Sequence, residues 1–178
     1  DSSGGNVFMS DNDPELVADA LPFTIKLYET LLQSLPRHEV LRLRTASLTI
    51  MYANAFLQTP AELLSSDEHE QKVHLFARAK NLFLRGRNML LDGLEMKYPG
   101  FRKALADKKL EEAKAMVGPE DLDTLYWTGA GWLSAFAIDP FDMKLGITVP
   151  QAAALMERVA ELDPHYGSGA IHDFYVLY

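Results

Sequence analysis

Three prolines at nearly equal intervals divide this chain into units built from paired helices. Pro36, Pro99 and Pro164 lie 63 and 65 residues apart, and each follows a segment whose apolar residues recur at helical spacing. Proline does not continue a helix, because it lacks a backbone N–H and its ring clashes with the preceding turn. A new helix follows each proline, directly in two cases and after a Lys/Glu-rich insertion in the third. The repeating unit is therefore a helix A followed by a helix B that ends at proline.

Helix signals run along the whole sequence and strand signals are nearly absent, so we expect an all-α fold. Asp13 followed by Pro14 has the N-cap and first-turn character of a helix start. Ser65, with Glu68 three residues later, forms a capping-box pattern at the start of another helix. The helices are expected at residues 13–34, 38–57, 65–98, 101–106, 110–117, 118–138 and 148–162, with a last one beginning near Tyr166.

Several features qualify this helix pattern. Pro22 should kink the first helix or divide it in two, and Thr59-Pro60 should end the second. Residues 139–147 form the longest stretch that we expect to be irregular. In the first helix, four apolar residues share one face at helical spacing: Leu16, Phe23, Leu27 and Leu31.

Helix A of each unit mixes small and aromatic residues. One copy contains Leu43-x-x-Ala46-Ser47, and the other contains Trp127-x-x-Ala130-Gly131. Small residues let two helix backbones approach closely, and aromatic residues fill the space beside them. Together with the proline that ends helix B, this pattern is similar to tetratricopeptide repeats. We therefore expect a tetratricopeptide-like helix-hairpin repeat solenoid, with units longer than the usual ones.

Composition excludes several classes of function. The formal net charge is −8 and no stripe of Lys and Arg occurs, which argues against a nucleic-acid partner. The chain contains no cysteine, so its own residues supply no disulfide, thiolate nucleophile or Cys-based zinc site. No apolar run reaches the roughly 18 residues that a membrane span requires.

The residues that could carry chemistry do not form a catalytic or metal-binding pattern. His69-Glu70 and His74 come close to a zinc-protease motif, but the two histidines lie five residues apart and do not share a helix face. His172-Asp173 has no Gly-x-Ser-x-Gly element to complete a triad. We therefore expect a protein that is not an enzyme, with no catalytic residues, no metal and no cofactor.

Glycines inside the expected helices point to packing. Gly129-x-Gly131 has no preceding strand and so does not resemble a phosphate-binding loop; we expect it to serve close helix packing. Gly86 and Gly93 each weaken their helix by roughly 1 kcal/mol relative to Ala. They mark either positions of close helix contact or a bend.

Aromatic residues on the two A helices are the candidates for a binding site. They are accompanied by polar residues such as Asn54 and Gln58, a mixture that suits an apolar groove or channel in which polar tips orient a ligand. Plain core packing explains the same residues and stays open as the alternative. The candidate ligand or channel contacts are Tyr52, Phe56, Tyr126, Trp127 and Trp132.

Four segments in order resemble the TatT-like T component of tetratricopeptide-associated TRAP transporters. They are residues 10–29, 126–132, 154–164 and 166–172. The resemblance implies an exported, periplasmic lipoprotein held to a membrane through an N-terminal Cys that is absent from this sequence. It also implies a homotrimer that docks a solute-binding P subunit. An apolar channel would pass a hydrophobic or carboxylate ligand to that subunit.

The sequence predicts one domain organisation and leaves two interpretations of function. The Ser/Gly-rich start predicts a flexible linker over residues 1–12, followed by a helical repeat domain over residues 13–178 that we expect to be C-terminally incomplete. In the first reading the chain is the transport accessory component that the resemblance implies. In the second it is a generic helical-repeat scaffold that binds a peptide or protein partner.

Overall fold

The computed structural model describes residues 13–169, and every regular element in that range is helical. The all-α prediction is confirmed for this range, whereas the predicted linker over residues 1–12 and the C-terminal residues 170–178 lie outside it. The elements are α2 (Pro14–Ser34), α3 (Glu39–Ala53), η1 (Asn54–Gln58), α4 (Thr59–Leu63), η2 (Ser66–Glu68), α5 (His69–Lys97), α6 (Phe101–Ala106), α7 (Leu110–Met116), η3 (Pro119–Asp121), α8 (Leu122–Ile138), α9 (Met143–Gly146), α10 (Val149–Leu162) and η4 (Tyr166–Gly169).

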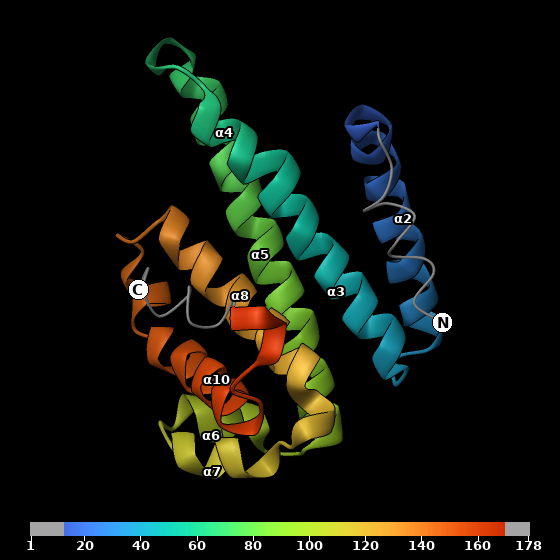
Figure 1. Cartoon of the computed structure of the whole chain (residues 1–178), viewed down its shortest axis with the longest axis vertical. Coiled ribbons are helices and arrows are strands. Elements are labelled where there is room, and N and C mark those ends of the chain that lie inside the picture. Colours follow the sequence, from blue (N-terminus) through green and yellow to red (C-terminus); the bar gives the residue numbers. More distant parts are fainter. Residues whose placement is uncertain (1–12, 170–178) are drawn as a thin grey trace.

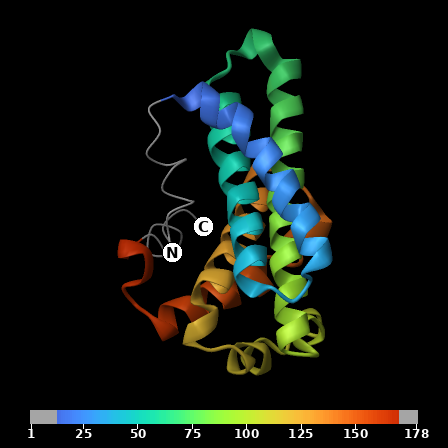
Figure 2. The same ribbon diagram turned by 90° about the vertical axis from the view of Figure 1, so that its right-hand side faces the viewer.

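The long helices pack in chain order. Helix α2 contacts α3, α3 contacts α5, α5 contacts α8, and α8 contacts α10 (Figure 1). Figure 2 shows α2 lying obliquely across the outer side of α3. The short helices α6 and α7 close the lower end of the molecule in Figure 1, beside α10. The predicted hairpins are therefore α3 with α5 and α8 with α10.

The centre of the core is the point where α3, α5 and α8 approach most closely. A Cβ atom at Gly86 of α5 would lie 2.6 Å from Cγ1 of Ile50, and one at Gly131 of α8 would lie 3.0 Å from Cδ1 of the same side chain. Ile50 is 3 % exposed and fills the space that both glycines leave. The Cβ at Gly131 would also lie 3.0 Å from the carbonyl oxygen of Phe83. The packing role predicted for Gly131 is confirmed, and of the two readings of Gly86 the structure supports close helix contact.

Prolines lie inside two of the helical segments. Helix α2 is not divided at Pro22, although division was one of the two outcomes predicted there. Pro60 does not end its segment either, because a π-helical turn over Asn54–Gln58 leads directly into α4. Proline removes one hydrogen-bond donor and crowds the turn before it, and a wider π turn relieves that crowding. The predicted stop at Thr59-Pro60 is therefore wrong.

Helix ends follow local signals closely. Glu68 Oε2 accepts hydrogen bonds from the backbone N–H and the hydroxyl of Ser65, so the predicted capping box is present. Nδ1 of His38 caps α3 by accepting from the Leu41 N–H at 3.0 Å. The stretch expected to be irregular contains the short helix α9, which Asp142 caps by accepting from the Leu145 N–H.

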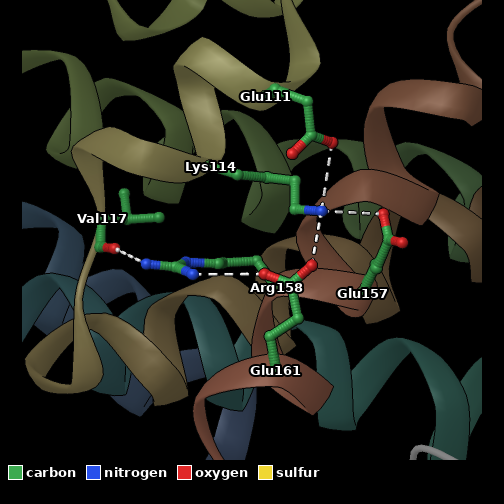
Figure 3. A network of polar contacts seen from close by, with 6 residues as sticks. All are labelled: Glu111, Lys114, Val117, Glu157, Arg158 and Glu161. Atoms are coloured by element: carbon green, nitrogen blue, oxygen red, sulfur yellow. Dashed lines mark hydrogen bonds and ion pairs between the residues drawn. The ribbon is translucent and has the colours of Figure 1, made fainter.

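A buried lysine joins α7 to α10 (Figure 3). Lys114 is 4 % exposed. The hydrogen bond to Glu161 is the largest contribution that raises the pKa of Lys114 above its usual value, and the same bond lowers the pKa of Glu161. Arg158 strengthens the connection by donating to the carbonyl oxygen of Val117 at 3.0 Å. Three carboxylates have an oxygen within 3.2 Å of the Lys114 Nζ: Glu111, Glu157 and Glu161.

Gly131→Ala should lower the free energy of unfolding by about 1–3 kcal/mol, because the new methyl group meets Ile50 and a main-chain oxygen that does not move aside easily. Urea unfolding measures this. The cost should shrink in an Ile50→Val background, which lacks the Cδ1 atom nearest to Gly131. An equal cost in both backgrounds would contradict the close approach described above.

Lys114→Met should make stability less sensitive to acid. The depressed pKa of Glu161 stabilises the fold above the carboxyl's ordinary pKa, and this stabilisation is lost as the pH falls through the lower folded-state value. Removing this cation removes the largest cause of the depression, so the drop in unfolding free energy between pH 6 and pH 3 should be smaller than in the native protein. Lys144→Met is the control, since this exposed lysine makes no ion pair among residues 13–169. Identical acid sensitivity in Lys114→Met and the native protein would count against the network.

Candidate functional site

Two of the predicted aromatic residues lie together where α3 passes into the π turn. The ring centroids of Tyr52 and Phe56 are 5.6 Å apart, with the planes tilted by 32°. Both side chains are half-buried. π turns inside α-helices occur often at functional positions, since the extra residue redirects the side chains that follow. Along the chain, this pair lies just before α4.

The second pair lies near the start of α8. The rings of Tyr126 and Trp127 meet edge to face with centroids 5.6 Å apart, and Tyr126 also contacts Tyr166 at 5.3 Å. Burial raises the pKa of Tyr126 above its usual value. The hydroxyl of Tyr166 donates to a carboxylate oxygen of Asp123. A half-buried aromatic cluster with hydroxyl groups at its edge therefore sits on this part of α8.

Trp132 has a different environment from the other four candidates. It is only 3 % exposed, and its indole N–H donates to the Thr148 hydroxyl at 2.8 Å. The guanidinium carbon of Arg87 lies 4.6 Å from the ring centroid, a cation–π distance. Burial and the nearby Arg102 lower the pKa of Arg87 to about 10. Trp132 is thus a core side chain covered by an arginine.

The structure groups the five candidates into two pairs and one buried tryptophan. Among residues 13–169, no ring–ring contact joins the pair on α3 to the pair on α8. Tyr52, Tyr126 and Trp127 pack against the hydrophobic core from its edge. Their role as ligand contacts stays a prediction, and so does the core-packing alternative.

An exposed apolar face on α2 is the feature whose importance the sequence did not reveal. The four residues with shared helical spacing do lie on one face, but that face points to solvent, with exposed fractions from 45 to 72 %. Helix α2 instead buries a second apolar face against α3, formed by Val17, Leu21, Ile25 and Leu32. We call the exposed face the α2 stripe; its residues are Leu16, Phe23, Leu27 and Leu31.

The described residues offer no metal centre and no helix able to span a bilayer. No group of three or more His, Asp or Glu side chains within residues 13–169 is arranged to hold a metal ion. His69, Glu70 and His74 are all exposed near the start of α5, in keeping with a solvated helix face. Over the same range, none of the helices is both long and apolar enough to cross a membrane.

Comparison with known proteins assigns the chain to a family. A family model described as the TRAP transporter T-component (TAtT) matches residues 10–178. An uncharacterised protein of Treponema pallidum (strain Nichols) is 40 % identical over 174 residues, which make up 96 % of this chain and 54 % of that relative. The chain therefore spans about half the length of the relative that it matches.

The family description names a component of a TRAP transporter. The resemblance inferred from residues 10–29, 126–132, 154–164 and 166–172 is confirmed, since the family match covers all four segments. This chain belongs to the TRAP transporter T-component family.

Proposed function

We propose that this protein is a periplasmic accessory component of a TRAP-type transport system that docks the solute-binding subunit through the α2 stripe. The observation that carries the proposal is the exposure of four large apolar side chains on one helix face, from 45 % for Leu31 to 72 % for Phe23. Contiguous apolar patches on a water-soluble domain mark interaction sites, because leaving them in water is unfavourable.

The surroundings of the α2 stripe also suit a protein partner. Exposed charged residues border it along one side of the helix: Glu15, Asp19 and Lys26. An apolar centre with a charged margin is the usual anatomy of a protein–protein interface. The opposite face of α2 is already buried against α3, and within residues 13–169 the stripe residues stay exposed to solvent.

Family membership supports the finer features of the proposal. We take the protein to be a lipoprotein anchored at its N-terminus and assembled as a homotrimer. Its helix pairs would form a tetratricopeptide-like solenoid, an arrangement supported by the packing of α3, α5, α8 and α10 in chain order. A hydrophobic or carboxylate ligand would pass along the half-buried aromatic residues Tyr52, Phe56, Tyr126 and Trp127, with the buried Trp132 as a fifth candidate contact.

Phe23→Glu and Leu27→Glu should each weaken docking of the cognate solute-binding subunit by at least about tenfold, because each places a charge in the apolar centre of the interface. Light scattering gives the native mass of the protein alone and with the subunit, and titration gives the affinity. Both side chains are exposed, so the variants should keep the native unfolding free energy.

Phe141→Glu is the matched control, since Phe141 is 90 % exposed but lies in the segment between α8 and α9. It should leave docking unchanged. The α2 assignment fails if Phe141→Glu abolishes docking and the α2 variants do not. If the native protein does not bind the solute-binding subunit at all, a generic scaffold becomes the better interpretation of its function. A changed mass of the protein alone in the α2 variants would instead place the homo-oligomer contact on the stripe.

Tyr52→Ala and Trp127→Ala test the aromatic contacts. Each should weaken binding of the fluorescent fatty acid cis-parinarate several-fold, measured by fluorescence titration, if these side chains line the ligand path. Tyr28→Ala provides a comparison on α2, away from both aromatic pairs. If the Tyr52 and Trp127 variants lose only stability and bind the probe like the native protein, core packing explains both residues.

A further inference from the structure

A cleft opens where the start of α3, the last turns of α5 and the start of α8 meet, at the lower end of these helices in Figure 1. Its volume of about 90 Å³ is enough for a small molecule or a few ordered waters. None of the five predicted aromatic contacts lines it. The lining residues are Pro36, Arg37, Glu39, Arg42, Leu43, Leu90, Gly93, Leu94, Met96, Lys97, Asp121 and Thr124.

Two hydrogen bonds to backbone carbonyl oxygens hold Arg42 in the wall of this cleft. Its Nη1 donates to the carbonyl oxygen of Met89 at 3.0 Å, and its Nη2 donates to that of Pro36 at 2.6 Å. The side chain crosses α5 at Gly93, where a Cβ atom would lie 2.5 Å from the Arg42 Cδ. The glycine therefore leaves the room that the arginine occupies, which accounts for one of the two helix-weakening glycines noted in the sequence.

The carboxylates of the cleft are already engaged by a different cation. Lys97 Nζ lies 2.9 Å from Asp121 Oδ1 and 3.3 Å from Glu39 Oε2. Asp121 Oδ2 accepts from the Tyr98 hydroxyl at 2.6 Å and from the Gly118 N–H at 3.0 Å. These bonds satisfy the buried carboxylate of Asp121 and keep it oriented toward Lys97.

Arg37 and Arg42 carry charges that the cleft does not neutralise. Within residues 13–169, neither guanidinium has a carboxylate at ion-pair distance, and the nearby Asp92 pairs with Arg102. Burial lowers the pKa of Arg42, with Asp92 acting in the opposite direction, so the charge sits where water has been partly removed. Backbone carbonyls orient a guanidinium without cancelling its charge, and three of its five N–H donors remain for another acceptor.

Apart from Thr124, the rest of the lining is apolar. Leu43 and Met96 are half-buried and present apolar surface to the cleft, whereas Leu90 and Leu94 are each 1 % exposed and add little to it. A cleft with an oriented cation and apolar side chains in its wall matches a molecule with an anionic head and a short apolar body.

We propose that this cleft binds a small amphipathic anion, with its oxyanion head on Arg42 and Arg37 and its apolar part against Leu43 and Met96. The site is separate from the α2 stripe and from the aromatic pairs, so it stands without the docking role proposed above.

The test uses the native protein and two probes of equal length, hexanoate and 1-hexanol. Amide resonances of Gly93, Leu43 and Thr124 report on the cleft in a heteronuclear NMR titration. Hexanoate should shift them saturably, and 1-hexanol should bind at least about tenfold more weakly because it lacks the charge. Added NaCl should weaken the binding of hexanoate and not that of 1-hexanol.

Arg42→Gln should weaken hexanoate binding by about tenfold or more. Because Arg42 also ties Pro36 to Met89, this variant can lose stability. Arg37→Gln therefore provides a second measurement at an exposed residue that makes no hydrogen bond or ion pair with its side chain among residues 13–169. Its expected effect is a few-fold loss of affinity. Arg78→Gln, on the exposed surface of α5, is the matched control and should bind hexanoate like the native protein.

Several results would overturn the proposal. They are equal affinity for 1-hexanol and hexanoate, native affinity in both Arg37→Gln and folded Arg42→Gln, and shifts centred on Tyr52 or Trp127 instead of Gly93. The absence of saturable shifts up to about 50 mM hexanoate would also overturn it. No transporter subunit enters the experiment, so its failure and a failure of docking are distinguishable.

Discussion

The close approach of α3, α5 and α8 around Ile50 is the constraint on which the remaining packing depends. Two glycines on different helices leave the space for one side chain, which brings three backbones together at a single level. Helix α3 can approach the other two helices because its side chains in this layer are short. Thr45 and Thr49 are fully buried, and their hydroxyls donate to carbonyl oxygens one turn earlier. No buried hydroxyl in this layer therefore lacks an acceptor. The other helices pack outward from this layer.

Local chemistry explains why so much of the helical pattern was predictable. Capping by Ser65 with Glu68, and the proline and glycine that separate α5 from α6, act over three or four residues and can be read directly from sequence. Pro60 shows the limit of such signals. A proline predicts that an ordinary turn is disturbed, but a π turn absorbs the disturbance and the chain stays helical. Whether it does so depends on packing against α5, which the local sequence does not contain.

The face that a helix buries was harder to predict than the helix itself. Helix α2 has two apolar faces, one ending at Leu31 and one ending at Leu32, and periodicity alone does not say which of them meets α3. Burial was equally hard to predict for the residues of the candidate site. Residue types identified the aromatic mixture on helix A, yet they did not separate buried Trp132 from half-buried Trp127. The cleft around Arg42 is formed by three segments that are distant in the sequence. Gly93, a glycine inside a helix, is the sequence feature that marks the close approach of Arg42 to α5.

The turn between α2 and α3 links the α2 stripe to the cleft. Leu35, half exposed, follows the last residue of α2, and the next residue, Pro36, presents its carbonyl oxygen to Arg42. A partner that shifted α2 along α3 would move this carbonyl and with it the guanidinium that faces the cleft. Coupling between two binding events is reciprocal, so an anion that fixed Arg42 would in turn favour one position of α2. The rigid α3–α5–α8 layer makes this turn the place where such coupling would act, because the opposite wall of the cleft belongs to α5 and α8, which the Ile50 packing holds in place.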